Sequence, residues 1–143
     1  MKRRGFTLIE LAFVLAIITF LAAVTIPGYH LVWLRVQASE ARNMLTALSH
    51  AESTWRRDHG AYLECVAGSD EDVPKVARAL APRACWKALG LNTSERSRFR
   101  YQVKLTPTGF EAIAEGDLDA DGVTSRFTLQ SNDLVITSEN ELE

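Results

Sequence analysis

The chain has 143 residues, of which 47% are hydrophobic and 24% are charged, and its formal net charge is −2. Three of its 16 basic residues stand in the first four positions, which leaves 13 against all 18 acidic residues in the remainder. This acidic remainder argues against nucleic-acid binding through bulk positive charge. The length allows one domain of modest size together with an anchoring segment.

An apolar segment follows the basic cluster at residues 2–4. From Leu11 to Leu34 the sequence contains no Asp, Glu, Lys or Arg, which is long enough for a helix to cross a hydrocarbon core of about 30 Å. The basic cluster before it predicts a cytoplasmic N-terminus. A removable secretory signal would have a shorter apolar core and a small-residue cleavage site, whereas here the apolar pattern continues past Ala22 and Ala23. The sequence therefore favours a retained anchor.

Residues 4–11, with the sequence RGFTLIEL, resemble the processing site of type IV prepilins and type II secretion pseudopilins. In that family a membrane peptidase cleaves after the glycine, and the new N-terminal residue is then methylated. The resemblance implies a leader peptide at residues 1–5, cleavage between Gly5 and Phe6, and methylation of Phe6. Glu10 falls on the family's glutamate at the fifth mature position, and Pro27 falls where many members have a helix-bending proline.

Glu10 is a carboxylate at the edge of an apolar segment, where an unpaired charge costs several kcal/mol. From the residues alone, it is either a functional group with a partner or a side chain that reaches the lipid headgroups. In the family, this glutamate is thought to pair with the terminal amine of a neighbouring subunit. The resemblance implies the same assembly role for Glu10, with Phe6 supplying the amine.

The helical pattern continues beyond the apolar segment. Apolar and small residues recur every three or four positions, at Leu34, Ala38, Ala41, Leu45, Leu48, Ala51 and Trp55. Asp58 and His59 followed by Gly60 predict the end of the helix, with Gly60 as its cap. One helix from about residue 6 to residue 59 would be about 80 Å long. Its first half is apolar all round and its second half carries one apolar stripe, and Pro27 is expected to bend or loosen it.

The remainder of the chain predicts a small antiparallel sheet after an irregular region. A short helix is expected near residues 73–81, within the irregular region. Alternation of polar and apolar residues predicts strands at 98–105, 110–115 and 123–130, with a further strand at 134–137. In the third of these strands, the side chains expected to face the same way are Val123, Phe127 and Leu129.

The expected fold class is α+β, with a long N-terminal helix packed on a three- to four-stranded antiparallel sheet, and the first half of the helix spans the membrane. The pilin family has this architecture as well. The expected divisions are the leader at residues 1–5, the transmembrane and polymerisation half of the helix at 6–34, and a periplasmic or extracellular globular domain at 35–143.

Cys65 and Cys85 are the only two cysteines, and both follow the anchor on its non-cytoplasmic side. An even pair in that environment indicates a disulfide, which would close a loop of about 20 residues and contribute about 3 kcal/mol. The alternative is a zinc site with His50 or His59. No CxxC or HxxxH spacing supports zinc, so the disulfide is favoured.

The segment Gly116–Gly122 places Asp117, Asp119 and Asp121 at alternate positions before a glycine. This spacing lets a tight loop direct several oxygens at one hard cation, with Ca²⁺ as the first candidate. The loop is not an EF-hand, because the twelfth position is Thr128 rather than Glu and the flanking segments are predicted strands. The alternative is that Asp and Gly only serve the turn.

Four basic residues, Arg96, Arg98, Arg100 and Lys104, are expected to share one face of the first strand. They form either a stripe that binds DNA phosphates or a solvated strand face, and the acidic balance of the domain favours the second interpretation. The three histidines are scattered, and no nucleophile stands at a recognisable spacing from a base. The sequence therefore predicts no enzyme activity.

These features predict a structural subunit of a type IV pilus-like filament that assembles through its N-terminal helix. The implied partners are further copies of the chain, the prepilin peptidase and N-methyltransferase, an inner-membrane assembly platform and inner-membrane lipid. The expected location is the bacterial inner membrane, followed by a periplasmic or cell-surface filament. One alternative is a type II secretion pseudopilin. The other is a single-span envelope protein whose domain binds a metal or ligand, which would keep its leader and tolerate Glu10→Leu.

Overall fold

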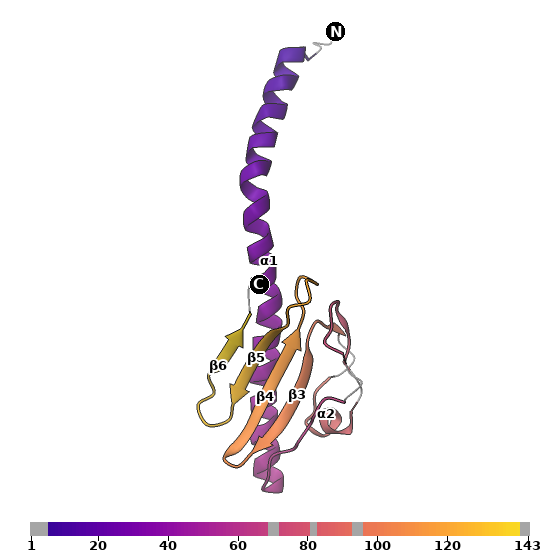
Figure 1. Ribbon diagram of the computed structural model, residues 1–143, viewed down its shortest axis with the longest axis vertical. Helices are drawn as coiled ribbons and strands as arrows, with labels where there is room; N and C mark the ends of the chain where they lie inside the picture. The colour runs from indigo at the N-terminus through magenta and orange to yellow at the C-terminus, as the bar shows by residue number, and fades with distance from the viewer. Residues whose placement is uncertain (1–5, 69–71, 81–82, 93–95, 141–143) are drawn as a thin grey trace, which may run out of the picture. The chain divides into compact units, whose positions relative to one another are not determined.

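A computed structural model describes residues 6–68, 72–80, 83–92 and 96–140 of the chain (Figure 1). The predicted processing residue Gly5 lies outside the described residues. The chain divides into two compact units, residues 1–33 and 34–143. Helix α1 (Leu8–His59) contributes its first half to one unit and its second half to the other.

The first unit consists of the apolar half of α1. Residues Leu8–Thr25 have a mean hydropathy of 2.5 and none of them is buried, and by length and composition this segment is able to cross a membrane. Large side chains are exposed throughout, with Phe13 and Phe20 both 70% exposed. Pro27 lies within α1, which continues through it without interruption, and its side chain is outside what the structure describes.

The second half of α1 packs on the sheet of the second unit through one stripe of its surface. The buried residues of this stripe are Leu34, Ala38, Ala41, Leu45 and Leu48. They join a core built by the aromatic and aliphatic side chains of the sheet, among them Phe99, Val103 and Phe127. The spacing of three and four residues explains the one-sided burial, because it keeps these side chains on one face of the helix.

The helix ends as the sequence predicts. Gly60 has φ +81° and its N–H donates to the carbonyl of Arg56 at 2.8 Å, which is the left-handed cap that glycine adopts without strain. The chain that follows is held by Glu52, whose Oε2 accepts from the N–H of Leu63 at 3.0 Å. Glu52 is fully buried, and Oε1 has no hydrogen-bond partner among the described residues.

The main sheet has four antiparallel strands in the order β3-β4-β5-β6. The strands are β3 (Arg100–Thr106), β4 (Gly109–Gly116), β5 (Ser125–Gln130) and β6 (Ile136–Glu139). Each is joined to the next by a short connection, so the α+β class and the four-stranded antiparallel sheet are confirmed. At Gly109, next to the β3–β4 turn, an added Cβ would lie 1.9 Å from Oγ of Ser131, so a larger residue would force that side chain to move.

The outer face of the sheet, on the side away from the core, carries an ion-pair cluster. Glu115 on β4 stands opposite Arg100 on β3 and Arg126 on β5. Its carboxylate accepts from Nη2 of Arg100 and, at 3.0 Å, from Nε of Arg126. Burial raises the pKa of Glu115, but the hydrogen bonds and charges of the two arginines outweigh burial, and the pKa lies below its usual range.

The region between α1 and the main sheet differs from the sequence-based expectation. No helix occurs in the described residues of 73–81. Residues of strand β1 (Arg78–Ala79) pair instead with β2 (Arg96–Ser97), and the short helix α2 (Ala84–Ala88) follows β1. Strand pairing at Arg78 and Ala79 thus overrides the local helical preference there, while α2 is anchored by the buried ring of Trp86.

The strand predicted at 123–130 begins later than expected. Val123 is 37% exposed and precedes β5, because its N–H is bonded to Oδ1 of Asp121 in the preceding loop at 2.7 Å. Ser125 takes the inward position beside Phe127 and Leu129, and its hydroxyl donates to the carbonyl of Asn140 at 2.7 Å. The expected alternation is therefore present, with Ser125 in place of Val123.

We expect Glu52→Gln to stabilise the protein increasingly as pH rises. Burial raises the pKa of Glu52 above the ordinary value of 4.5, so the folded protein binds this proton more tightly than the unfolded chain does. The stability that protonated Glu52 gives the wild type is fully present below the unfolded pKa and is lost as pH rises through the folded pKa, whereas glutamine does not titrate. Thermal melts of the full chain in detergent at pH 4, 6 and 8 should show a difference in Tm that widens with pH. A difference independent of pH would contradict this origin.

We expect Glu115→Gln to destabilise the protein by about 1–3 kcal/mol at pH 7, since it removes the anion that two arginines share. Because the pKa of Glu115 is lower in the folded protein, ionised Glu115 stabilises the fold at pH values above the unfolded pKa. This stabilisation is lost as pH falls through the folded pKa. The difference between variant and wild type should therefore shrink below about pH 4.5. Denaturant unfolding measures it, with Glu111→Gln on the same face as the control. Equal losses in the two variants would contradict the role of the cluster.

Candidate functional site

The first site is the start of α1, where Thr7 and Glu10 form a reciprocal cap. Oε2 of Glu10 accepts from the backbone N–H of Thr7 at 2.9 Å and from its hydroxyl at 2.8 Å. The N–H of Glu10 in turn donates to Oγ1 of Thr7 at 3.3 Å. This is the capping-box arrangement, in which a threonine before the helix and a glutamate three residues later satisfy each other's N–H groups.

The cap uses only one oxygen of the Glu10 carboxylate. Both hydrogen bonds end on Oε2, and within the described part of the chain no hydrogen bond is made to Oε1. The side chains around it are apolar and exposed, with Phe6 77% and Leu8 87% exposed. The start of α1 thus presents one carboxylate oxygen among apolar side chains. The cap was not recognised from the sequence, although the spacing Thr-x-x-Glu before an apolar run carries the signal.

The second site is the loop that connects β4 to β5. One carboxylate oxygen from each of Asp117, Asp119 and Asp121 lies within 4.8 Å of the others, so the loop brings together the three residues that the sequence singled out. The turn depends on left-handed backbone at Ala120, with φ +65°, and at Gly122, with φ +98°. Strands flank the loop on both sides, in agreement with the exclusion of an EF-hand.

Asp117 differs from the other two acids because its side chain is only 4% exposed. Oδ2 accepts from the N–H of Gly122 at 3.1 Å and lies 3.8 Å from Nζ of Lys75. Oδ1 is buried and has no hydrogen-bond partner among the described residues. A buried carboxylate oxygen without a partner is costly, and a bound cation would supply the missing interaction. The residues therefore fit a hard, oxygen-preferring cation such as Ca²⁺.

The disulfide between Cys65 and Cys85 holds the connecting region to the sheet. The two Cα atoms are 5.7 Å apart. Cys65 exchanges both backbone hydrogen bonds with Val103 of β3, at 2.9 and 2.8 Å, while Cys85 belongs to α2. The predicted pair thus ties α2 to the edge of the main sheet. Both sulfurs are engaged in this bond, so the zinc alternative at these cysteines does not apply.

The four basic residues predicted to share one strand face do not do so. Arg96 lies in β2, where its Nε donates to the carbonyl of Ala77 at 3.1 Å. Arg100 is paired with Glu115, and Lys104 remains exposed on β3. The prediction of a shared face is wrong because residues 98–99 form a bend that separates β2 from β3. A continuous basic face for DNA phosphates is absent from this set of residues.

Comparison with known families identifies the N-terminal segment. Residues 1–26 match the family model of the prokaryotic N-terminal methylation motif. The match covers the processing sequence and most of the apolar half of α1.

Curated relatives are similar over longer stretches of the chain. The chain is 43% identical over 60 residues to the fimbrial protein EcpC of Eikenella corrodens, a segment that is 42% of this chain and 39% of the relative. It is 43% identical over 61 residues to the type IV major pilin protein PilA of Myxococcus xanthus, covering 43% of this chain and 28% of the relative. It is 40% identical over 62 residues to the type IV major pilin protein PilE1 of Neisseria gonorrhoeae, covering 43% of this chain and 38% of the relative.

No solved structure matches the chain significantly. The matched segment spans less than two fifths of the length of each of these curated relatives. The chain carries a prokaryotic N-terminal methylation motif at residues 1–26 and is similar over part of its length to type IV pilins, which confirms the resemblance seen in residues 4–11.

Proposed function

We propose that the chain is the precursor of a structural subunit of a type IV pilus-like filament. Three features near the start of α1 together carry this proposal. They are the methylation motif, an exposed apolar surface, and the Glu10 carboxylate, of which only Oε2 accepts hydrogen bonds from the described residues. Prepilin peptidase cleaves between Gly5 and Phe6 and methylates Phe6. The apolar half of α1 then holds the subunit in the inner membrane until an assembly platform incorporates it into a periplasmic or surface filament.

Glu10 acts in assembly because its environment leaves one oxygen without a partner. In an apolar packing of helices, an uncompensated carboxylate costs several kcal/mol. The amine at Phe6 of a neighbouring subunit offsets that cost through Oε1, while Thr7 keeps Oε2 in the cap. This pairing specifies the register between neighbouring helices, because a displaced neighbour would leave both the Glu10 carboxylate and the Phe6 amine unpaired. The role of the chain is structural, and none of these steps requires a catalytic group from it.

Two alternatives make different predictions about the same residues. A type II secretion pseudopilin shares the processing and the helix, and the relatives named above as pilins favour the pilus. A single-span envelope protein would have no use for cleavage after Gly5 or for the charge of Glu10.

We expect the N-terminal peptide to begin with methylated Phe6. Mass spectrometry on sheared-filament and membrane fractions of a producing strain should find this peptide in abundant sheared material. Confinement of the same peptide to membranes would favour the pseudopilin alternative. An intact leader in every fraction would exclude processing and promote the envelope-protein alternative.

Substitutions at Glu10 and Thr7 separate charge pairing from helix capping. Glu10→Gln keeps the capping geometry, since glutamine also serves at this position of the box, but it removes the charge. We expect incorporation into filaments to fall by at least about 10-fold, because losing a buried pair costs more than the ~1.4 kcal/mol of a tenfold change.

The matched variant Thr7→Ala removes the capping hydroxyl, at about 1 kcal/mol of helix stability, and keeps the carboxylate. It should assemble at close to the wild-type level, with subunit amounts in the membrane fraction unchanged for both variants. Normal polymerisation of Glu10→Gln would rule out the pairing. Equal defects in the two variants would instead assign the effect to the cap.

We further propose that the β4–β5 loop binds Ca²⁺ through Asp117, Asp119 and Asp121. The supporting observation is the buried, unpartnered Oδ1 of Asp117, which a cluster of acids that only formed a turn would not require. The ion would contribute to the stability of the domain and not to catalysis. Nζ of Lys75, 3.8 Å from Oδ2, is the positive charge that the ion would accompany or displace.

Calcium should raise the Tm of the full chain in detergent, and a chelator should reverse the shift. At 100 times its dissociation constant, a ligand stabilises by about 2.7 kcal/mol. The double variant Asp119→Asn, Asp121→Asn should lose the shift. The control Asp133→Asn, at an exposed acid in another turn, should keep it. A wild-type Tm that does not respond to calcium would exclude the site.

A further inference from the structure

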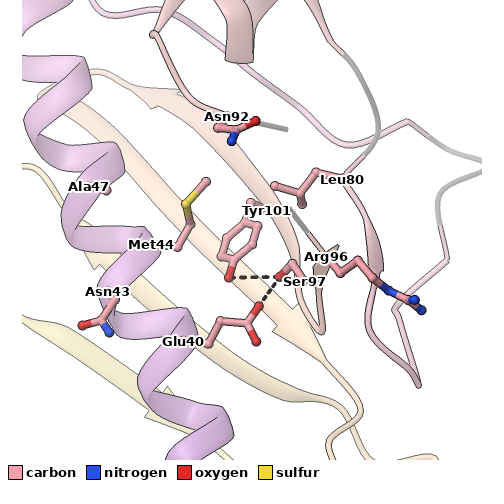
Figure 2. A pocket seen from close by; sticks show the side chains of 9 residues that line it. All are labelled: Glu40, Asn43, Met44, Ala47, Leu80, Asn92, Arg96, Ser97 and Tyr101. Atoms are coloured by element: carbon pink, nitrogen blue, oxygen red, sulfur yellow. Dashed lines mark hydrogen bonds between the residues drawn. The ribbon is translucent and has the colours of Figure 1, made fainter. Parts of the chain in front are cut away.

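A cleft beside the second half of α1 has no part in the roles described above. It has a volume of about 340 Å³ and lies between α1, β2 and β3, within the second unit (Figure 2). Met44 and Ala47 of α1, Leu80 and the ring of Tyr101 form its apolar lining. The volume is enough for one long side chain and too small for a folded segment.

A hydrogen-bond network connects the polar end of the cleft. Oε1 of Glu40 accepts from the hydroxyl of Ser97 and, at 3.1 Å, from the N–H of Arg98. Oγ of Ser97 lies 3.3 Å from the hydroxyl of Tyr101 and accepts from the N–H of Phe99 at 3.0 Å. Because this network ties Glu40 to both β2 and β3, its carboxylate is held in place at the cleft.

The charge at the cleft is negative. Both hydrogen bonds to Glu40 end on Oε1, and Oε2 accepts none within the described part of the chain. The neighbouring cation, Arg96, turns its guanidinium away from the cleft (Figure 2) and donates it to the carbonyl of Ala77. A fitting occupant therefore has an apolar stem of side-chain length and a positively charged end.

We propose that this cleft receives a lysine or arginine side chain of a second copy of the chain. The inference rests on the proposed function, in which α1 of each subunit is packed among neighbouring copies. The stem would lie on Met44, Leu80 and the Tyr101 ring while the charged end reaches Oε2 of Glu40, as long basic side chains do on apolar surfaces. Exposed cations are available on the same chain, for example Lys87 and Lys104.

The occupant is identified by photo-crosslinking in assembled filaments. A benzoylphenylalanine residue at Ala47, which is exposed and lines the cleft, should produce a covalent dimer of the full chain in sheared material. The joined peptide should contain a lysine or arginine at the contact. The neighbouring position Thr46, which is exposed but does not line the cleft, serves as the control site.

A second variant tests the charge. Glu40→Gln keeps acceptors for Ser97 and Arg98 and removes the negative charge, so filament yield should fall on the order of 10-fold, as expected for a lost charge pair. Glu64→Gln, at an exposed acid outside the cleft, should leave the yield unchanged. Subunit amounts in the membrane and formation of the disulfide should stay at the wild-type level in both variants.

The outcomes separate this inference from the proposed function. If wild-type filaments form but Ala47 crosslinks to another protein, to lipid, or no more than Thr46 does, the cleft proposal is overturned and the filament role stands. Assembly of Glu40→Gln at the wild-type level would overturn the cleft proposal in the same way. If the processed wild-type chain forms no filament, the proposed function fails and the cleft proposal fails with it.

Discussion

The packing of the second half of α1 on the four-stranded sheet is the constraint on which the second unit depends. Ala38 and Ala41 are fully buried, and they belong to the same core as the rings of Phe99 and Phe127. Because interiors are packed at high density, larger residues at the two alanines would move the helix away from the sheet. The contact from Glu52 to the following chain and the cleft at Glu40 both require the helix to stay packed on the sheet.

Three glutamates of α1 share one property. Glu10, Glu40 and Glu52 each use one carboxylate oxygen for a contact within the chain, and the other oxygen accepts no hydrogen bond from the described residues. Their surroundings give this property different consequences. Glu52 is fully buried, so burial raises its pKa. Glu10 and Glu40 lie at surfaces that the filament proposal places against neighbouring subunits, where the second oxygen is available to a cation.

Residues 72–80 connect the two candidate sites of the second unit. The carbonyl of Pro74 accepts from the N–H of Asp117 at 3.1 Å, and Lys75 faces the same aspartate. Farther along the same segment, the carbonyl of Ala77 holds the guanidinium of Arg96, and Leu80 lines the cleft. The acidic loop and the cleft thus share one supporting segment. The chain that follows residues 72–80 is restrained by the disulfide between Cys65 and Cys85.

Features that depend on local pattern could be predicted from the sequence. The apolar run, the stripe of α1 from Leu34 to Leu48 and the cap at Gly60 follow from spacing along one helix, and the methylation motif is a short contiguous sequence. Alternation indicated the four strands of the main sheet to within about two residues. The three aspartates were also evident, because a tight loop keeps alternate residues together. Tertiary structure decided what pairs with what across distance. Strand pairing replaced the helix expected at 73–81, the partnership of Glu115 with two arginines came from register, and the cleft at Glu40 arose where three separate segments meet. Such contacts join residues far apart in the chain, and no local period encodes them.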